Sequence, residues 1–181
     1  VLGFASGFRT VNALGHRRGE IDLLAVRPSH QGEGIGPRLI AALGEDAESW
    51  GIDMLRALIR IENRPSQKAF AQDGFVTDGR VHQLLLWEPL QGEEQQVRPE
   101  GVSLIPVDTV TYRGLWVEGL ATLNQTVQRA VVEAARILIA RQNRLNTGAL
   151  ILADESAALA RDLLEAATVQ GHYYWYEKRL N

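Results

Sequence analysis

The sequence predicts an α/β fold with a mixed, mostly antiparallel central sheet and helices on both faces. Short apolar runs, which are typical of buried strands, alternate with segments whose apolar residues recur at helical spacing. The first two runs enclose a polar turn, as in an antiparallel hairpin. From the second run onward, the order strand, helix, strand, helix, strand occurs twice, with a polar segment at 91–101 between the two copies.

The composition is ordinary for a globular protein of 181 residues, with 45% hydrophobic and 23% charged residues. A net charge of −3 argues against a broad nucleic-acid-binding face. The chain has no cysteine, which excludes disulfides and cysteine nucleophiles, and its four histidines show no metal-ligand spacing. No apolar run approaches the ~20 residues of a membrane span, and no signal sequence opens the chain. We therefore expect a cytoplasmic protein without a metal, a nucleic-acid partner or a membrane segment.

The first copy begins with strands expected at Val1–Ser6 and Glu20–Val26, which would pair across a polar turn. The elements expected after them are a helix over 36–50, a strand at Met54–Ile61, a short helix opened by Asn63 and a strand at Val81–Trp87. Apolar residues at helical spacing support the first helix, and Gly51 suits its C-terminal end.

The stretch from Glu20 to Gly36 reads as a strand that ends in a glycine loop and opens a helix. Pro28 stops the strand because it cannot donate to a ladder, and Pro37 suits the first turn of the helix. Glycines alternate at 32, 34 and 36. Glycines tolerate positive φ and close approach of a ligand, and successive N–H groups at a helix N-terminus favour an anion. The loop is therefore predicted to bind a diphosphate. A tight turn without a ligand is the alternative.

The glycine spacing fits neither a phosphate loop, which needs Gly-Lys-Ser/Thr, nor a G-x-G-x-x-G dinucleotide fingerprint. The string from Val26 to Gly36, V-x-P-x-x-Q-G-x-G-I-G, instead resembles the acetyl-CoA-binding motif of the GCN5-related N-acetyltransferase (GNAT) family. The resemblance extends over 2–90 and implies a GNAT-like fold with acetyl-CoA as acyl donor. The cofactor-binding residues that it implies are Leu24, Ala25, Val26, Gln31, Gly32, Glu33, Gly34, Ile35, Gly36, Pro37 and Asn63.

A second segment, from Asn63 to Phe75, resembles the family pattern N-x-x-S-x-x-x-(Y)-x-x-x-G-F. The resemblance implies that Asn63 meets the pantetheine arm of CoA, although a turn or cap role is the alternative. The family often has a Tyr that gives a proton to the departing thiolate. Here that position is Phe70, which has no proton to give.

Two acidic residues are candidates for the base that deprotonates an incoming ammonium. Glu20 and Asp22 alternate onto one face of the strand. In the histone-acetylating branch of the family a Glu stands at the place of Glu20, so Glu20 is the first candidate and Asp22 the second. Alternatively, both are solvated or paired with Arg17 or Arg18. Transfer of an acetyl group from acetyl-CoA to a primary amine by direct attack is thus the predicted function.

The acceptor is not identified by the sequence; a small amine and a peptide amine both fit. A non-catalytic CoA-binding or structural pseudo-acetyltransferase is the alternative function. Phe70 and the absence of the family's usual N-terminal strand and acceptor-side helices favour it. An exposed sheet edge would also allow a homodimer.

The domain boundaries predicted from the sequence are 1–90 for the acetyl-CoA-binding core, 91–101 for a linker and 102–181 for a degenerate GNAT-like half. The linker is polar and contains Pro99 and two glycines. The elements expected in the last part are strands at Val102–Val107, Tyr112–Leu120, Ala149–Ala153 and Tyr173–Leu180, a long helix around 127–139 and a helix capped by Ser156. Because 121–126 has no glycine, we expect a single CoA site. An unrelated α/β tail is the alternative.

Overall fold

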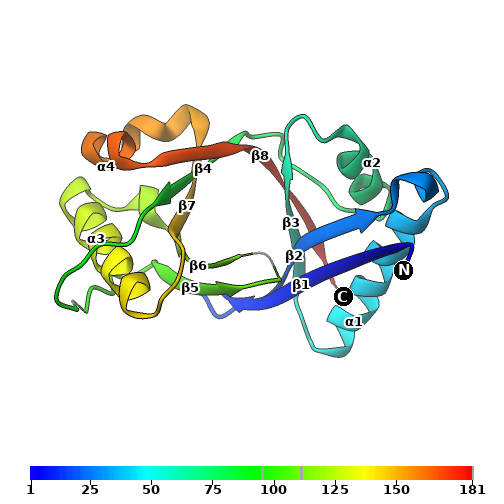
Figure 1. Ribbon diagram of the computed structural model, residues 1–181, viewed down its shortest axis with the longest axis horizontal. Helices are drawn as coiled ribbons and strands as arrows, with labels where there is room; N and C mark the ends of the chain where they lie inside the picture. The colour runs from blue at the N-terminus through cyan, green and yellow to red at the C-terminus, as the bar shows by residue number, and fades with distance from the viewer. Residues whose placement is uncertain (95, 111, 181) are drawn as a thin grey trace. The chain divides into compact units, whose positions relative to one another are not determined.

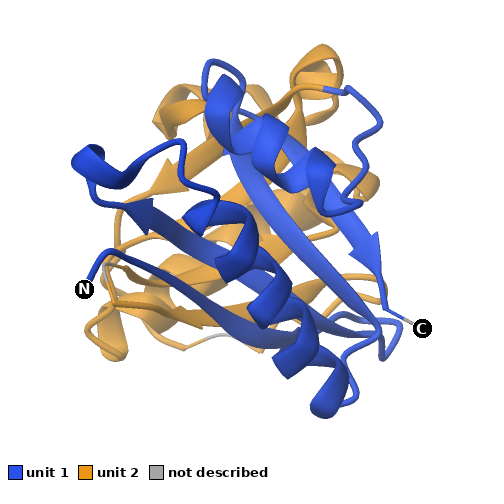
Figure 2. Ribbon diagram, turned by 90° about the vertical axis from the view of Figure 1, so that its right-hand side faces the viewer, with its two compact units in different colours: residues 1–80, 173–181 blue, residues 81–172 orange. Residues whose placement is uncertain are grey.

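The computed structural model describes residues 1–94, 96–110 and 112–180. The chain forms two compact units, coloured separately in Figure 2: unit 1 comprises Val1–Arg80 with Tyr173–Asn181, and unit 2 comprises Val81–His172. This division differs from the predicted boundaries at 90 and 102, because a C-terminal strand completes unit 1 while the strand after residue 80 belongs to unit 2. None of the helices in the described part of the chain has the length and apolarity needed to cross a membrane.

Unit 1 is a four-stranded mixed sheet with two helices. Its elements are β1 (Gly3–Val11), β2 (Arg17–Val26), η1 (Pro28–His30), α1 (Ile35–Ser49), β3 (Met54–Arg60), α2 (Arg64–Gln72) and residues 173–179 of β8 (Thr168–Arg179). The strand order is β1-β2-β3-β8. The β1–β2 and β3–β8 pairs are antiparallel and the β2–β3 pair is parallel. The predicted α/β class with a mixed, mostly antiparallel sheet is confirmed.

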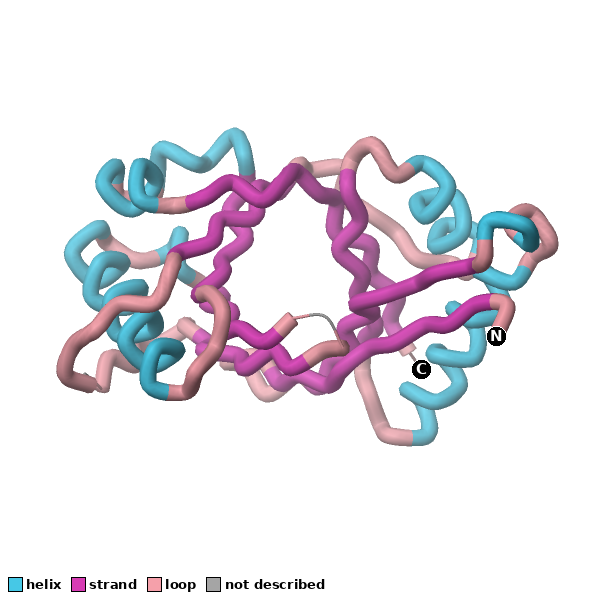
Figure 3. Tube along the Cα trace, in the orientation of Figure 1, coloured by secondary structure: helices cyan, strands magenta, loops and turns pink. Residues whose placement is uncertain are grey.

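Both helices of unit 1 pack on the same face of its sheet, whereas the sequence pattern predicted helices on both faces (Figures 1 and 3). The apolar side chains that alternate along β2 and β3, among them Ile21, Leu55 and Ala57, form one core cluster with Ile40 of α1 and Phe70 of α2. Burying these alternate side chains under the helices is the driving force for this layer. Helix α1 covers the span predicted from its apolar spacing.

Unit 2 has the same strand order and directions as unit 1. Its elements are β4 (His82–Trp87), β5 (Ser103–Asp108), β6 (Arg113–Glu118), η2 (Leu120–Thr122), α3 (Gln125–Arg141), β7 (Thr147–Leu152), η3 (Ala153–Ala158), α4 (Arg161–Ala166) and residues 168–172 of β8. The order is β5-β6-β7-β4. Here too the outer pairs are antiparallel and the central β6–β7 pair is parallel. Ser156 lies in η3 rather than capping a helix, and α4 begins later, at Arg161.

The shared strand order supports our proposal that the chain is an internal repeat. Strand β4 follows α2 in the chain yet completes the sheet of unit 2, and the main part of β8 follows α4 yet completes the sheet of unit 1. In this proposal, each repeat supplies the fourth strand of the other unit. The predicted linker contains no helix or strand within its described residues, 91–94 and 96–101.

Asp53 anchors the start of β2 and has a pH-dependent effect that can be measured. Its carboxylate accepts hydrogen bonds from the backbone N–H and the guanidinium of Arg17, at 3.0 and 3.2 Å. These bonds hold the pKa of Asp53 below its ordinary value of 3.8. A depressed pKa in the folded state contributes stability above the unfolded pKa, and this contribution is lost as the pH falls through the folded pKa.

We therefore expect Asp53→Asn to be less stable than the wild type at pH 7, with a difference that shrinks as the pH falls below about 4. Urea unfolding of both proteins over a pH series measures this. Glu48→Gln, at an exposed position of α1, controls for the loss of a carboxylate. A difference that stays constant down to pH 2.5 would contradict the assignment.

Candidate functional site

The site lies where β2 and β3 stop pairing. The parallel register joins Arg18–Ile21 to Met54–Ala57, yet β2 continues to Val26 and β3 to Arg60. On the other side of β2, Ser6 pairs with Leu23 and Gly7 with Ile21, so Asp22 is the extra residue of a β-bulge. Bulges bend a strand and increase its twist. The bend carries the end of β2 away from β3 and leaves a cleft between them.

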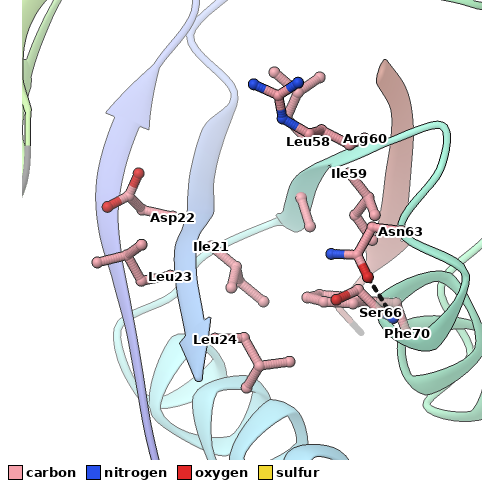
Figure 4. A pocket seen from close by; sticks show the side chains of 11 residues that line it. Ile21, Asp22, Leu23, Leu24, Leu58, Ile59, Arg60, Asn63, Ser66 and Phe70 are labelled. Carbon is pink, nitrogen blue, oxygen red and sulfur yellow. Dashed lines mark hydrogen bonds between the residues drawn. The ribbon is translucent and has the colours of Figure 1, made fainter. Parts of the chain in front are cut away.

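An inner cavity of about 190 Å³ occupies this cleft (Figure 4). The residues that line it come from β2, β3 and α2: Ile21, Asp22, Leu23, Leu24, Ala57, Leu58, Ile59, Arg60, Asn63, Ser66 and Phe70. Most of these side chains are apolar, and the two charged ones, Asp22 and Arg60, stand on different strands. The cavity therefore combines an apolar wall with one acidic and one basic group.

An outer groove of about 750 Å³ shares Leu24, Asn63 and Ser66 with the inner cavity. Its lining contains every predicted cofactor-binding residue except Glu33. The carboxylate of Glu33 instead lies 3.2 Å from Nδ1 of His30. The lining residues that the sequence analysis did not assign are His30, Pro65, Ser66, Lys68, Ala69 and Gln72. Five of them lie on α2. Their i, i+3 and i+4 spacing places most of them on one helix face, and this spacing could have identified them from the sequence.

The glycine loop has the geometry that an anion site requires. Gly32 and Gly34 have φ values of 86° and 75°, in the left-handed region that side chains disfavour. Gly34 is the N-cap of α1 and offers no side chain to the first N–H groups of that 15-residue helix. Gln31 donates to the carbonyl of Val26 at 3.3 Å, which ties the loop to the end of β2. The helix dipole adds a favourable field for an anion beside this terminus.

Helix α2 and its N-cap supply the other lining residues of the groove. Asn63 is the N-cap of this helix, and its Oδ1 accepts from the backbone N–H of Ser66 at 3.2 Å (Figure 4). This is the cap role that the sequence analysis kept as the alternative, and it places Asn63 in the lining of both cavities. Lys68 adds a cation to the lining of the groove. Phe70 is 3% exposed and stacks edge-on against Phe75.

The two predicted base candidates lie in different surroundings. Glu20 is 4% exposed and accepts hydrogen bonds from Arg56 at 2.7 and 3.1 Å and from the Thr10 hydroxyl at 2.9 Å. Arg56 is the cross-strand partner of Glu20 in the parallel register, and Arg18 lies 3.4 Å from the same carboxylate. Glu20 is not among the lining residues of the inner cavity or the outer groove, whereas Asp22 lines the inner cavity.

The corresponding region of unit 2 is built differently. There α3 is capped by Asn124, whose side chain accepts from the backbone N–H of Val127 at 3.1 Å. Gln128 is fully buried and donates to the carbonyls of Leu123 and Ala158, both at 2.9 Å. Leu120, Leu159 and Leu163 join the core cluster beside β6 and β7. A side chain thus satisfies the helix N-terminus that a bare glycine leaves open in unit 1.

Comparison with protein families matches residues 1–75 to the acetyltransferase (GNAT) family. Those residues contain β2, the glycine loop, α1 and α2. We refer to these matched residues, 1–75, as the GNAT segment. Among the curated proteins, no match was found. The GNAT segment contains all of the predicted base and cofactor-binding residues. All residues that line the inner cavity and the outer groove also come from this segment.

Solved structures extend the likeness beyond the GNAT segment. A protein from Thermoplasma acidophilum that is assigned as an acetyltransferase aligns with 99% of this chain and 74% of its own, with a TM-score of 0.54 and 10% identity. A GCN5-related N-acetyltransferase from Sphaerobacter thermophilus aligns with 97% of this chain and 76% of its own, with a TM-score of 0.50 and 13% identity. At these identities the likeness concerns the fold.

Another match is the NatC complex bound to Gag peptide and CoA, at 22% identity and a TM-score of 0.42 over 44% of this chain. The chain spans half the length of that protein chain.

Within the described residues, no group of three or more His, Asp and Glu side chains is arranged to hold a metal ion.

Proposed function

We propose that the protein binds acetyl-CoA in the outer groove and transfers its acetyl group to a primary amine in the inner cavity. The observation that carries this proposal is the β2–β3 cleft, which joins the inner cavity to a groove ending at the uncapped N-terminus of α1. The diphosphate of CoA would lie on the N–H groups after Gly34, with Lys68 as a second charge partner. The pantetheine arm would run between β2 and α2 towards the cleft.

The transfer needs no covalent enzyme intermediate. The amine nitrogen attacks the thioester carbonyl, the carbon–nitrogen bond forms, the carbon–sulfur bond breaks and the thiolate leaves with the electron pair. A backbone N–H of β2 beyond Ile21, where the β2–β3 ladder has ended, would stabilise the developing oxyanion. The base takes one proton from the ammonium before the attack, and the nitrogen loses a second proton to water once the carbon–nitrogen bond has formed. With Phe70 at the inner wall, we propose that the thiolate takes its proton from water.

Of the two base candidates, we propose Asp22 as the base and Glu20 as a structural residue. Asp22 lines the cavity in which the amine would stand, so its carboxylate can accept a proton directly or through water. Glu20 shares its two oxygens among Arg56, Arg18 and Thr10. A base must reach the proton that it takes, and a carboxylate held in a bidentate ion pair away from the cavity lining does not meet that condition.

A non-catalytic CoA-binding protein is the second candidate function, and Phe70 is the observation that favours it. The inner cavity has an apolar ring where a proton donor for the leaving thiolate would be expected. Such a protein would bind acetyl-CoA as the enzyme does and would release no CoA thiol in the presence of any amine. Binding and turnover must therefore be measured separately.

Binding is tested by thermal unfolding with and without acetyl-CoA for the wild type and Gly34→Val. At 100 times its Kd, acetyl-CoA is expected to add about 2.7 kcal/mol of stability, which raises Tm by roughly 5–10 °C. Gly34→Val forces a β-branched residue into the left-handed region and crowds the anion site, so we expect the shift to disappear. Gly44→Ala, at a glycine of α1 where an added Cβ would meet no atom within 4 Å, is the matched control and should keep the shift. An equal shift for Gly34→Val would overturn the placement of the diphosphate.

Turnover is tested by following released CoA thiol with a thiol reagent. The absence of cysteine means that the protein itself contributes no thiol signal. A suitable amine panel is L-leucine, L-leucinamide, spermidine and a short peptide with a lysine. Release that depends on an added amine supports the enzyme. Binding without release from any amine supports the second candidate.

A further inference from the structure

We propose that the acceptor is a primary amine that also carries a carboxylate, of the class of small aliphatic amino acids, and that Arg60 binds the carboxylate. This inference rests on the proposed acetyl transfer and names the substrate class of the inner cavity. It follows from the charges, the contacts of Arg60 and the apolar wall of that cavity.

Two groups of opposite charge stand at the same end of the inner cavity. Asp22 is the bulged residue of β2, and Arg60 is the last residue of β3. Figure 4 shows both near one end of the cavity, with Leu24 and Phe70 at the other end. An amino acid carries its ammonium and its carboxylate on one carbon atom. A single ligand can therefore place its amine towards Asp22 and its carboxylate towards Arg60.

The guanidinium of Arg60 lies beside an aromatic ring and a carboxylate. The guanidinium carbon lies 5.3 Å from the ring centre of Tyr173 on β8, and Nη1 lies 3.6 Å from the carboxylate of Glu62. Burial raises the pKa of Tyr173, so its phenol is neutral at physiological pH. A guanidinium over an aromatic face keeps a planar fork of several N–H donors at its edge. These contacts are compatible with bidentate binding of a carboxylate, which is the geometry that Arg favours.

The charge of Arg60 also selects against other amines. An amine without a carboxylate would bring its ammonium into a cavity that already holds a guanidinium, and like charges at close range disfavour binding. An amide in place of the carboxylate loses the charge-assisted hydrogen bonds. A ligand with both charges can pair its ammonium with Asp22 and its carboxylate with Arg60.

The remaining lining restricts the side chain of the ligand. Apart from Asp22, Arg60, Asn63 and Ser66, all of the lining residues are apolar. The cavity has a volume of about 190 Å³, and the acetyl group must share it. A short aliphatic side chain gains from burial against such a wall, by about 0.8 kcal/mol for each buried CH₂ group. A charged side chain would lose its hydration there.

The test compares L-leucine with L-leucinamide, which differ only in the carboxylate. For the wild type saturated with acetyl-CoA, we expect kcat/KM to be at least tenfold higher for L-leucine. Arg60→Gln should raise KM for L-leucine at least tenfold with a smaller change in kcat, and should leave KM for L-leucinamide nearly unchanged. Arg60→Lys, which keeps the charge without the planar fork, should restore part of the preference. Arg64→Gln is the matched control, because Arg64 bonds Gln67 on α2 and lines neither cavity.

Calorimetric titration of the CoA-bound protein with both ligands gives a readout that does not need turnover. Tighter binding of L-leucine that Arg60→Gln abolishes supports the proposal. Equal binding of both ligands, tighter binding of L-leucinamide or a preference that survives in Arg60→Gln overturns it, while the proposed function stands as long as acetyl-CoA binds and an amine is acetylated. Failure of acetyl-CoA to bind the wild type overturns the proposed function instead.

Discussion

Glu20→Gln is expected to lower the free energy of unfolding by about 3–5 kcal/mol, because it removes the charge from a buried carboxylate that is bonded to Arg56. Arg56 is itself 7% exposed, and the guanidinium of Arg18 lies beside the same carboxylate. Removing one partner of a buried ion pair leaves an uncompensated charge in a medium where solvation is poor. For a protein of this size the loss corresponds to a fall in Tm of at least about 6 °C.

Urea unfolding of Glu20→Gln and of Glu45→Gln, at an exposed position of α1, measures this effect against a control of the same chemistry. The same variants separate the two roles of Glu20. If Glu20 is a structural residue, Glu20→Gln is less stable than the wild type. At a temperature where the variant is folded, it still binds acetyl-CoA and releases thiol. A variant as stable as the wild type but without turnover would return the base role to Glu20.

Asp22→Asn is expected to lower kcat by about 10²- to 10⁴-fold, the usual contribution of a general base. The amine reaches the cavity as an ammonium and must lose a proton before it can attack. Asn has nearly the shape of Asp but cannot take that proton. Because Asp22 lies in the inner cavity and not in the lining of the outer groove, the affinity for acetyl-CoA should stay close to that of the wild type.

Thiol release with the best amine of the panel measures kcat, and the thermal shift with acetyl-CoA measures binding in the same preparation. Asp46→Asn, at an exposed position of α1 outside the lining of both cavities, is the matched control. An unchanged kcat in Asp22→Asn would remove Asp22 from the mechanism. A loss of stability together with the loss of turnover would point to a positioning role for the bulge instead.

Sequence reasoning predicted the conformation of the glycine loop because its signals are local. Gly32 and Gly34 need positive φ, and the helix that follows supplies its N–H groups from neighbouring residues. Such features depend on about a dozen consecutive residues, and these residues lie within the GNAT segment. The α/β class and α1 were predictable for the same reason, since helical and strand periodicities are properties of short windows.

The choice between Glu20 and Asp22 needed the tertiary structure. Both alternate onto one face in the sequence pattern, yet the bulge at Asp22 and the partner Arg56, 36 residues away, divide them into a cavity residue and a buried ion pair. A bulge depends on the register with the neighbouring strand, which one strand's own residues do not specify. The role of Asn63 as both cap and lining residue also depends on how α2 returns to β3.

The amino-acid sequence by itself thus determined the glycine loop, its helix and the class of fold, because these depend on neighbouring residues. The tertiary structure alone decided which acidic residue lines the cavity, that Arg60 stands with it, and that β4 belongs to unit 2 while the main part of β8 belongs to unit 1. The physical reason is that strand pairing joins residues far apart in the chain. Pairing is stabilised by backbone hydrogen bonds and by burial of apolar faces, and many strands can provide both. The local sequence pattern of one strand therefore does not select its partner.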